Sequence, residues 1–228
     1  MTPGPIPGNF PWPVTEIRLE LDGLEIDLVK VADQDSLLDA LIAKGIDHED
    51  VRDERIPYWA DLWPSALGLS RYLIRNAVVK PGQNALELGC GLGLPGIVAG
   101  KLGAASVVLS DYLPEALDFA GKNWMKNLAV AAQTRLIDWR NPDPADGADL
   151  VLASDITYEA RFFAELPHAF RTLCRPGGRI LVSDPRRAVA QSFFAELPAH
   201  GFTVECTPIE IQWENLFRII DIYRIQSE

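Results

Sequence analysis

One stretch decides the fold of this 228-residue chain: Asn84-Ala-Leu-Glu-Leu-Gly-Cys-Gly-Leu-Gly-Leu-Pro-Gly-Ile-Val-Ala-Gly-Lys-Leu102. An apolar run ends at Glu87, glycine then recurs from Gly89 to Gly96, and apolar residues return at helical spacing from Ile97. This order predicts a strand, a glycine-rich turn and a helix. Glycines permit positive φ angles and let a ligand approach main-chain N–H groups, and the helix adds its N-terminus. We therefore expect the turn to bind a nucleotide-like ligand.

Two classes of ligand fit such a turn. The sequence from Gly91 to Gly96 reads Gly-x-Gly-x-x-Gly, the pattern of dinucleotide-binding turns. Glu87 argues against a dinucleotide, because its carboxylate would repel a pyrophosphate in a partly desolvated site. A cationic or zwitterionic ligand would not be repelled. An NAD-dependent oxidoreductase is therefore the weaker alternative.

The same residues resemble a known motif. Glu87, Gly89, Gly91 and Gly93 form Glu-x-Gly-x-Gly-x-Gly, which resembles motif I of class I S-adenosylmethionine-dependent methyltransferases. The resemblance implies that these four residues bind S-adenosylmethionine, which carries a sulfonium and an ammonium group. It also implies a Rossmann-like sheet and a reaction that leaves S-adenosylhomocysteine.

Composition narrows the partners and the compartment. The formal net charge is −11 at pH 7, so we expect no nucleic-acid partner. Three cysteines without paired spacing indicate reduced thiols, as in a cytoplasmic protein. No apolar run has membrane-spanning length and the N-terminus lacks a basic and an apolar region, so we expect a soluble, unexported protein without membrane contact.

Other chemistries find little support. The three histidines, His48, His168 and His200, are isolated, which gives no zinc-binding spacing. We therefore expect no metal. Cys90 lies inside the glycine-rich turn and is interpreted as a small filler beside the cofactor rather than a nucleophile.

The first 55 residues are expected to be an appendage to a core domain at 56–228. Prolines recur through residues 3–13 and predict an arm without regular structure, whose role the sequence does not fix. Apolar residues then alternate on both sides of Gly23, which predicts a β-hairpin over residues 17–31.

Two further N-terminal features precede the core. Residues 33–45 predict an amphipathic helix whose inward-facing positions are Leu37, Leu38, Leu41 and Ile42. Residues 47–55 are dense in charge, with acids in excess when the helix is included. This stretch is either a solvated surface or a surface that attracts a basic substrate.

Residues 57–66, Pro-Tyr-Trp-Ala-Asp-Leu-Trp-Pro-Ser-Ala, form the second unusual segment. Core packing is the commoner role of such aromatic residues. The segment and the following Leu-Ser-Arg-Tyr-Leu resemble the seven-strand lysine methyltransferases of methyltransferase family 16. The resemblance implies that Trp63 lies against the cofactor. We expect the helix from Ser65 to Asn76 to lie over the first strand of the sheet.

The next two strands end in polar residues. Asp111 follows an apolar strand about 20 residues after the glycines, a position suited to accept both ribose hydroxyls, and Tyr112 lies beside it. A third strand, 134–137, closes with Asp138 and Trp139. In class I relatives this corner holds the adenine. Asp138 either accepts from the adenine amino group or caps the turn, and Trp139 either stacks on the adenine or covers the sheet edge.

The fourth strand supplies the candidate catalytic residues. An apolar run from Asp149 to Ala153 predicts a strand buried on both faces. Ser154 follows as a candidate cofactor ligand, and Asp155-Ile-Thr-Tyr158 resembles the Asp-x-x-Tyr motif of family 16. The resemblance implies that Asp155 and Tyr158 face the methyl group. Asp155 is also a candidate cap of a following helix that contains Phe162, Phe163, Leu166 and Phe170, and the two roles are compatible.

The C-terminal third completes the sheet. A fifth strand, 180–182, leads to Asp184-Pro-Arg-Arg187, which resembles an Asp-Pro-Gly-Arg stretch of relatives that methylate electron-transfer flavoprotein; Arg186 replaces that glycine. Residues 202–211 and 216–225 predict an antiparallel hairpin at the sheet edge. The fold class is therefore α/β: a Rossmann-like seven-stranded sheet with an antiparallel C-terminal hairpin, helices on both faces, and an N-terminal hairpin and helix.

These observations together favour a protein lysine methyltransferase that acts by in-line methyl transfer onto an accessible lysine. A small-molecule N-methyltransferase and a non-catalytic cofactor-binding module are the alternatives, because family resemblance does not fix the acceptor. The identity of the acceptor, the number of methyl groups transferred and the oligomeric state stay open.

Overall fold

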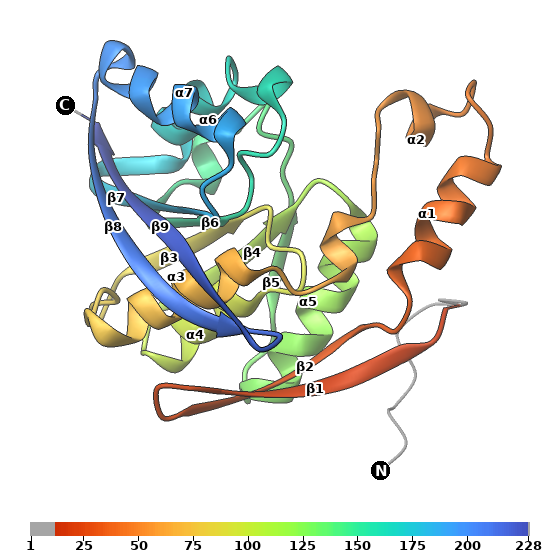
Figure 1. Cartoon of the computed structure of the whole chain (residues 1–228). Coiled ribbons are helices and arrows are strands. Elements are labelled where there is room, and N and C mark those ends of the chain that lie inside the picture. Colours follow the sequence, from red (N-terminus) through yellow and green to blue (C-terminus); the bar gives the residue numbers. More distant parts are fainter. Residues whose placement is uncertain (1–11, 228) are drawn as a thin grey trace.

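A computed structural model describes residues 12–227, so the predicted proline-rich arm lies almost entirely outside the described residues. Seven strands form one mixed sheet in the order β5-β4-β3-β6-β7-β9-β8 (Figure 1). Its strands are β3 (Asn84–Leu88), β4 (Ser106–Asp111), β5 (Gln133–Leu136), β6 (Ala148–Ser154), β7 (Cys174–Asp184), β8 (Phe202–Trp213) and β9 (Leu216–Ser227). This is the α/β architecture that the sequence predicts.

The strand order reverses at β3. Its neighbours β4 and β6 both run parallel to it, so their carboxyl ends meet at one edge of the sheet. A crevice forms outside the carboxyl ends at such a reversal, because the connections leave in opposite directions. The glycine-rich turn follows β3 directly and therefore opens into this crevice.

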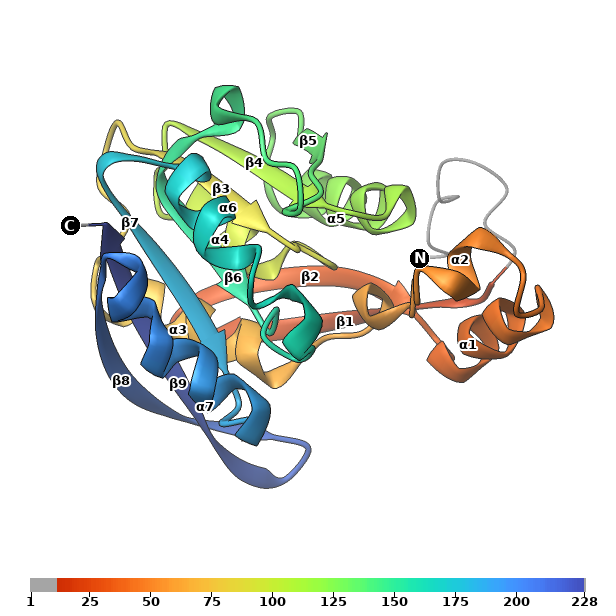
Figure 2. The same cartoon turned by 90° about the horizontal axis from the view of Figure 1, so that it is seen from above.

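Helices cover both faces of the sheet (Figures 1 and 2). The helices α3 (Pro64–Arg75), α4 (Leu94–Lys101) and α5 (Pro114–Asn127) pack on one face, and α6 (Leu166–Leu173) and α7 (Ala188–Glu196) cover the other. In β6, Leu150 and Leu152 belong to the first hydrophobic core, whereas Val151 and Ala153 belong to the second. A strand buried on both faces reads as a continuous apolar run for this reason.

The last two strands are antiparallel, as predicted. β9 pairs with β7 from Ile180–Ile225 to Asp184–Asp221, and β8 pairs with β9 at the edge. Glu214 and Asn215 make the connecting turn with φ angles of 48° and 63°.

The predicted N-terminal hairpin consists of β1 (Val14–Leu21) and β2 (Leu24–Val31). Two amide side chains of α5 bind the backbone of β2. Asn123, which is fully buried, accepts from the Val29 N–H at 2.7 Å and donates to the Val29 carbonyl at 3.1 Å. Asn127 makes the equivalent pair with Asp27 at 3.0 and 2.7 Å. These four bonds pair with backbone groups of β2 as a neighbouring strand would, and they fix the hairpin to the core.

The predicted N-terminal helix forms as α1 (Gln34–Ala43), followed by the short α2 (Glu49–Arg52). The prediction that its apolar residues point inward is wrong for Leu38 and Ile42, which are 37% and 63% exposed. No residue of α1 is buried, because the helix lies beside the body instead of on a sheet face (Figure 2).

Two further predictions need correction. α3 does not lie over the first strand; it packs on β7, β8 and β9 beside α4. Gly68 permits this approach, since a Cβ there would lie 2.8 Å from the Cβ of Ile220. The single helix expected to contain Phe162 and Phe170 is two pieces, a 3-10 turn at Ala160–Phe162 and α6. Pro167 favours a new helix start, because proline suits the first turn.

Candidate active site

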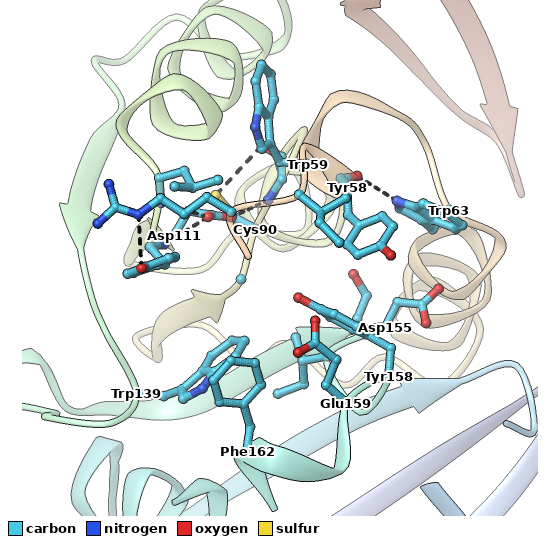
Figure 3. A pocket seen from close by; sticks show the side chains of 18 of the residues that line it. Tyr58, Trp59, Trp63, Cys90, Asp111, Trp139, Asp155, Tyr158, Glu159 and Phe162 are labelled. Carbon is cyan, nitrogen blue, oxygen red and sulfur yellow. Dashed lines mark hydrogen bonds between the residues drawn. The ribbon is translucent and has the colours of Figure 1, made fainter. Parts of the chain in front are cut away.

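A cavity of about 400 Å³ opens at the carboxyl ends of β3, β4 and β6. This size is in the range of sites for small ligands. All predicted site residues except Glu87 line it, namely Trp63, Gly89, Gly91, Gly93, Asp111, Tyr112, Asp138, Trp139, Ser154, Asp155 and Tyr158. Figure 3 shows Asp111 on one side of the cavity and Asp155 with Tyr158 on the opposite side. The sheet thus brings together residues that are far apart in sequence.

The glycine-rich turn requires glycine for two physical reasons. Gly91 has a φ of +50°, and a Cβ there would lie 3.4 Å from the backbone oxygen of Trp59. Gly96 lies in the first turns of α4, where a Cβ would approach Glu87 Oε2 to 2.7 Å. The left-handed backbone therefore disfavours a side chain at Gly91, and close packing leaves no room for one at Gly96.

Glu87 does not line the cavity, which corrects its expected position beside the ligand. Strand alternation directs its side chain towards α4, where it is fully buried and accepts from the Gly96 N–H at 2.8 Å. Burial raises the pKa of this carboxyl well above its usual value, and the nearby Asp111 adds to the shift. Because it accepts from the backbone of the turn and helix that follow β3, Glu87 is better described as a support of the turn.

Asp111 ends β4 and holds the turn from the opposite side. Its carboxylate accepts from the backbone N–H groups of Gly91, Tyr112 and Leu113 at 2.9, 2.8 and 3.1 Å. It is 9% exposed, and burial raises its pKa to about 6 although these hydrogen bonds oppose the rise. An ionised carboxylate at this position can accept from ligand hydroxyls.

A chain of charged side chains crosses one rim of the cavity. Asp138 accepts from the Arg140 backbone N–H at 2.9 Å and side-chain Nε at 2.8 Å, which is the turn-capping role considered for it. Burial opposes ionisation of Asp138, but the Arg140 bonds outweigh it and leave the pKa lowered. Arg140 also binds Asp53 at 3.1 Å. Arg55 donates to the hydroxyl of Tyr112 at 3.1 Å. The segment before the core is thereby tied to the ends of β4 and β5.

The charged stretch 47–55 is largely paired within the chain. Arg55 contacts Asp50 at 2.8 Å and Glu49 at 2.9 Å, and residues 53–56 line the cavity. These ion pairs favour the interpretation as a solvated surface.

Aromatic side chains form the walls of the cavity (Figure 3). The indole N–H of Trp63 donates to the Tyr58 carbonyl at 2.7 Å. The Tyr58 ring meets the Tyr158 ring edge-on, with centroids 5.2 Å apart. Trp139 meets Phe162 in the same way at 5.4 Å. Aromatic walls suit a flat heterocycle, because such rings bury a large area and stack.

The opposite end of the cavity carries Asp155 and Tyr158. Asp155 is 8% exposed, has a φ of +62°, and forms an ion pair with Arg187. It does not cap the following 3-10 turn, which has no side-chain cap, so the capping role predicted for it is wrong. Burial and the nearby Glu159 and Asp111 raise the pKa of the Tyr158 hydroxyl, which therefore stays protonated and can donate a hydrogen bond.

Sequence reasoning missed several lining residues, among them Tyr58, Arg140, Glu159, Arg161 and Phe162. Tyr58 lay within the segment that predicted Trp63, and Arg140 follows Trp139 directly, so proximity to a predicted residue was the available signal. No periodicity marks Glu159 or Arg161.

The structure also bears on nucleophilic cysteine, metal and membrane-spanning segments. Cys90 is buried, and burial raises the pKa of its thiol well above the usual value, which disfavours a nucleophilic thiolate. Within residues 12–227, no three His, Cys, Asp or Glu side chains gather in a way that could hold a metal. Over the same span, no helix is long and apolar enough to cross a membrane.

The site thus combines a glycine cradle, a buried carboxylate at the end of the next strand, aromatic walls and a polar far end. The fold is that of known methyltransferases. Magnesium protoporphyrin IX methyltransferase from Synechocystis PCC 6803, solved with bound SAH, superposes with a TM-score of 0.56. The match covers 84% of this chain and 94% of that one at 16% identity, so it shows the fold alone.

Residues 50–200 match the sequence profile described as "Lysine methyltransferase", and the chain belongs to this family. It is 32% identical over 160 residues to the electron transfer flavoprotein beta subunit lysine methyltransferase of Danio rerio, covering 70% of this chain and 62% of that protein. It is 33% identical over 117 residues to the histone-arginine methyltransferase METTL23 of Rattus norvegicus, covering 49% and 52%. The matches therefore span between about half and three fifths of these relatives' own length.

Proposed function

We propose that the protein is an S-adenosylmethionine-dependent protein lysine methyltransferase. The observation that carries the proposal is the pairing, in one cavity, of the glycine turn and Asp111 at one end with Asp155 and Tyr158 at the other. Family membership supports lysine as the acceptor. We assign this activity to a domain at residues 56–228, with residues 1–55 as its appendage.

The residues present fit the cofactor. Gly89, Gly91 and Gly93 all have positive φ angles, between 50° and 81°, and leave the main-chain surface of the turn open to a ligand. Asp111 would accept from the ribose hydroxyls. We place the adenine near Asp138 and Trp139, and the methionine portion near Trp63 and Ser154, in keeping with the lining of the cavity.

S-adenosylmethionine supplies a methyl group on a sulfonium, and S-adenosylhomocysteine remains after transfer. The chain's own residues would act mainly by position, because holding two reactants in near-attack geometry can supply several kcal/mol (~7–11 in the best cases). Tyr158 packs against Tyr58 and narrows the slot for the acceptor side chain. Its protonated hydroxyl would donate a hydrogen bond at this end.

Asp155 would orient the amine that accepts the methyl group. A lysine with an ordinary pKa of about 10.4 enters as an ammonium and must lose its proton to water before it can attack. A carboxylate oxygen can then accept from an amine N–H and direct the lone pair into the cavity. The N–C bond would form as the C–S bond breaks, and the methylated lysine would leave as an ammonium.

The partner in this proposal is a protein with an accessible lysine. We also propose a cytoplasmic location, supported by the three cysteines, none of which is paired in a disulfide.

The test is transfer of a tritiated methyl group into lysate from cells that lack this protein. We expect one labelled protein, with the methyl group on a lysine ε-amine by mass spectrometry. The Asp155→Asn variant should not label this protein. Asp118→Asn, which changes an exposed acid outside the cavity, is the matched control. Label on arginine would overturn the lysine assignment, and label confined to small molecules would replace the protein acceptor.

A further inference from the structure

Arg187 is the charged partner of Asp155 in the cavity. Its side chain, 29% exposed, reaches from the loop after β7 to the carboxylate of Asp155 at the end of β6 and forms an ion pair with it. Both residues line the cavity. The candidate catalytic carboxylate therefore already has a cationic partner within the chain.

The backbone of Arg187 is fixed by Asp184. Asp184, which is fully buried, accepts from the Arg187 backbone N–H at 2.7 Å and from the Thr157 hydroxyl at 2.9 Å. Arg187 Nη1 also lies 3.8 Å from Asp184 Oδ2. The preceding residue, Arg186, points elsewhere and binds Asp221 through two bonds of 3.0 and 2.9 Å. Only the second of the two adjacent arginines reaches the cavity.

This pairing bears on a problem in the proposed reaction. A buried carboxylate without a partner would stabilise a lysine ammonium, which has no lone pair and cannot attack a methyl group. A carboxylate paired with a guanidinium carries little net charge towards a third group. It can still accept a hydrogen bond from a neutral amine.

We propose that Arg187 is a positioning residue that holds Asp155 and cancels its charge, so that the acceptor lysine reacts as the neutral amine. The inference rests on the proposed function and adds a residue to it. The ammonium loses its proton to water, the neutral amine donates one N–H to Asp155, and its lone pair stays free for the methyl group. Other ionisable groups line this end of the cavity: Tyr58, Tyr158, Glu159, Glu54, Arg161 and, across the cavity, Asp111, with Asp184 behind Arg187.

The experiment compares Arg187→Gln, Arg187→Lys and the matched control Arg186→Gln. The substrate is the acceptor protein that the lysate assay identifies, used in its unmethylated form. Methyl transfer is measured at saturating acceptor from neutral to alkaline pH, and binding of S-adenosylhomocysteine is measured by calorimetry. We expect Arg187→Gln to move the half-maximal pH upward by about one unit or more, because the bare carboxylate favours the ammonium. S-adenosylhomocysteine affinity should stay within about twofold, since the change lies at the acceptor end.

The two controls separate charge from structure. Arg187→Lys keeps a cation and should keep the wild-type midpoint, and Arg186→Gln should leave the profile unchanged. An unshifted profile in Arg187→Gln overturns the inference while the proposed function stands. If wild-type protein labels no lysine at all, the proposed function itself fails.

A stability measurement tests the ion pair without any acceptor. Removing one partner leaves an uncompensated buried charge, whereas removing both does not. We therefore expect the double variant Asp155→Asn/Arg187→Gln to melt above Arg187→Gln. Additive losses in melting temperature would mean that the two side chains are not coupled, and would also overturn the inference.

Discussion

Asp111 allows the sharpest prediction about cofactor binding. Its carboxylate is 9% exposed at the end of β4, and its pKa is raised to about 6 by burial. A hydrogen bond to a charged group contributes about 1.5–3 kcal/mol, so replacing the carboxylate by a neutral amide should cost about 2 kcal/mol. That loss corresponds to a Kd for S-adenosylhomocysteine about 30-fold higher for Asp111→Asn at neutral pH.

The pH dependence follows from the same shift. Ligand hydroxyls prefer the ionised carboxylate, so binding should be full above the pKa and weaken as pH falls through about 6. At pH 5 the carboxylate of the free protein is ionised in about one molecule in ten, which predicts wild-type binding about eightfold weaker than at neutral pH. Asp138 stays ionised over this range, because its pKa is lowered.

Calorimetric titration of S-adenosylhomocysteine at several pH values measures both effects. Asp111→Asn should bind weakly and with nearly constant Kd between pH 5 and neutral, whereas Asp118→Asn should follow the wild-type curve. Melting temperatures of the unliganded variants separate a lost contact from unfolding. The reasoning fails if Asp111→Asn binds as tightly as wild type, or if it keeps the wild-type slope with pH.

Three other substitutions test packing and the acceptor end. Gly96→Ala should lower the free energy of unfolding by about 1–3 kcal/mol in urea titrations, because there is no space for a methyl group at this position. The control Gly121→Ala lies on the same sheet face, where an added Cβ would have no atom outside its own helix closer than 3.8 Å, and it should raise the free energy of unfolding by up to about 1 kcal/mol. Equal effects of the two substitutions would refute the packing argument. Asn123→Ala should lower the free energy of unfolding by about 3 kcal/mol, since it removes three buried hydrogen bonds. The control Asn76→Ala changes an exposed residue and should alter this free energy by no more than about 0.5 kcal/mol. Similar losses in the two variants would contradict the role given to the Asn123 amide. Tyr158→Phe should lower kcat about tenfold in the methyl-transfer assay with unchanged S-adenosylhomocysteine affinity, and a change confined to affinity would place this hydroxyl at the wrong end of the cavity.

The parts of the fold that could be predicted are those whose patterns have one physical solution. An apolar run followed by glycines with positive φ has few alternatives to a strand and a tight turn. Asp111 ends β4 and Asp155 follows β6, and the carboxyl ends of these parallel strands share one edge of the sheet. The position of Asp155 opposite the methyl group is implied by the resemblance to the Asp-x-x-Tyr motif, and strand position alone does not give it.

The errors have physical causes too. The period of α1 was right, but periodicity reveals an apolar face without revealing what covers it, and Leu38 and Ile42 face solvent. Glu87 was placed beside the ligand by its motif. Side chains alternate along a strand, which places Glu87 with Ala85 on the face that α4 covers. The alternation of β3 could therefore have predicted that Glu87 points away from the cavity. The pairing of Asp155 with Arg187 could not be predicted from spacing, because the ends of the parallel strands β6 and β7 share an edge without showing which side chains meet there.

Arg186 adopts a backbone conformation that usually requires glycine. Its φ is +65°, in the region that glycine enters without strain. The left-handed conformation costs about 1–2 kcal/mol for a residue with a side chain. The two bonds to Asp221, which is 7% exposed, oppose that cost. The strained backbone at Arg186 is therefore stabilised by an ion pair that lies outside the cavity.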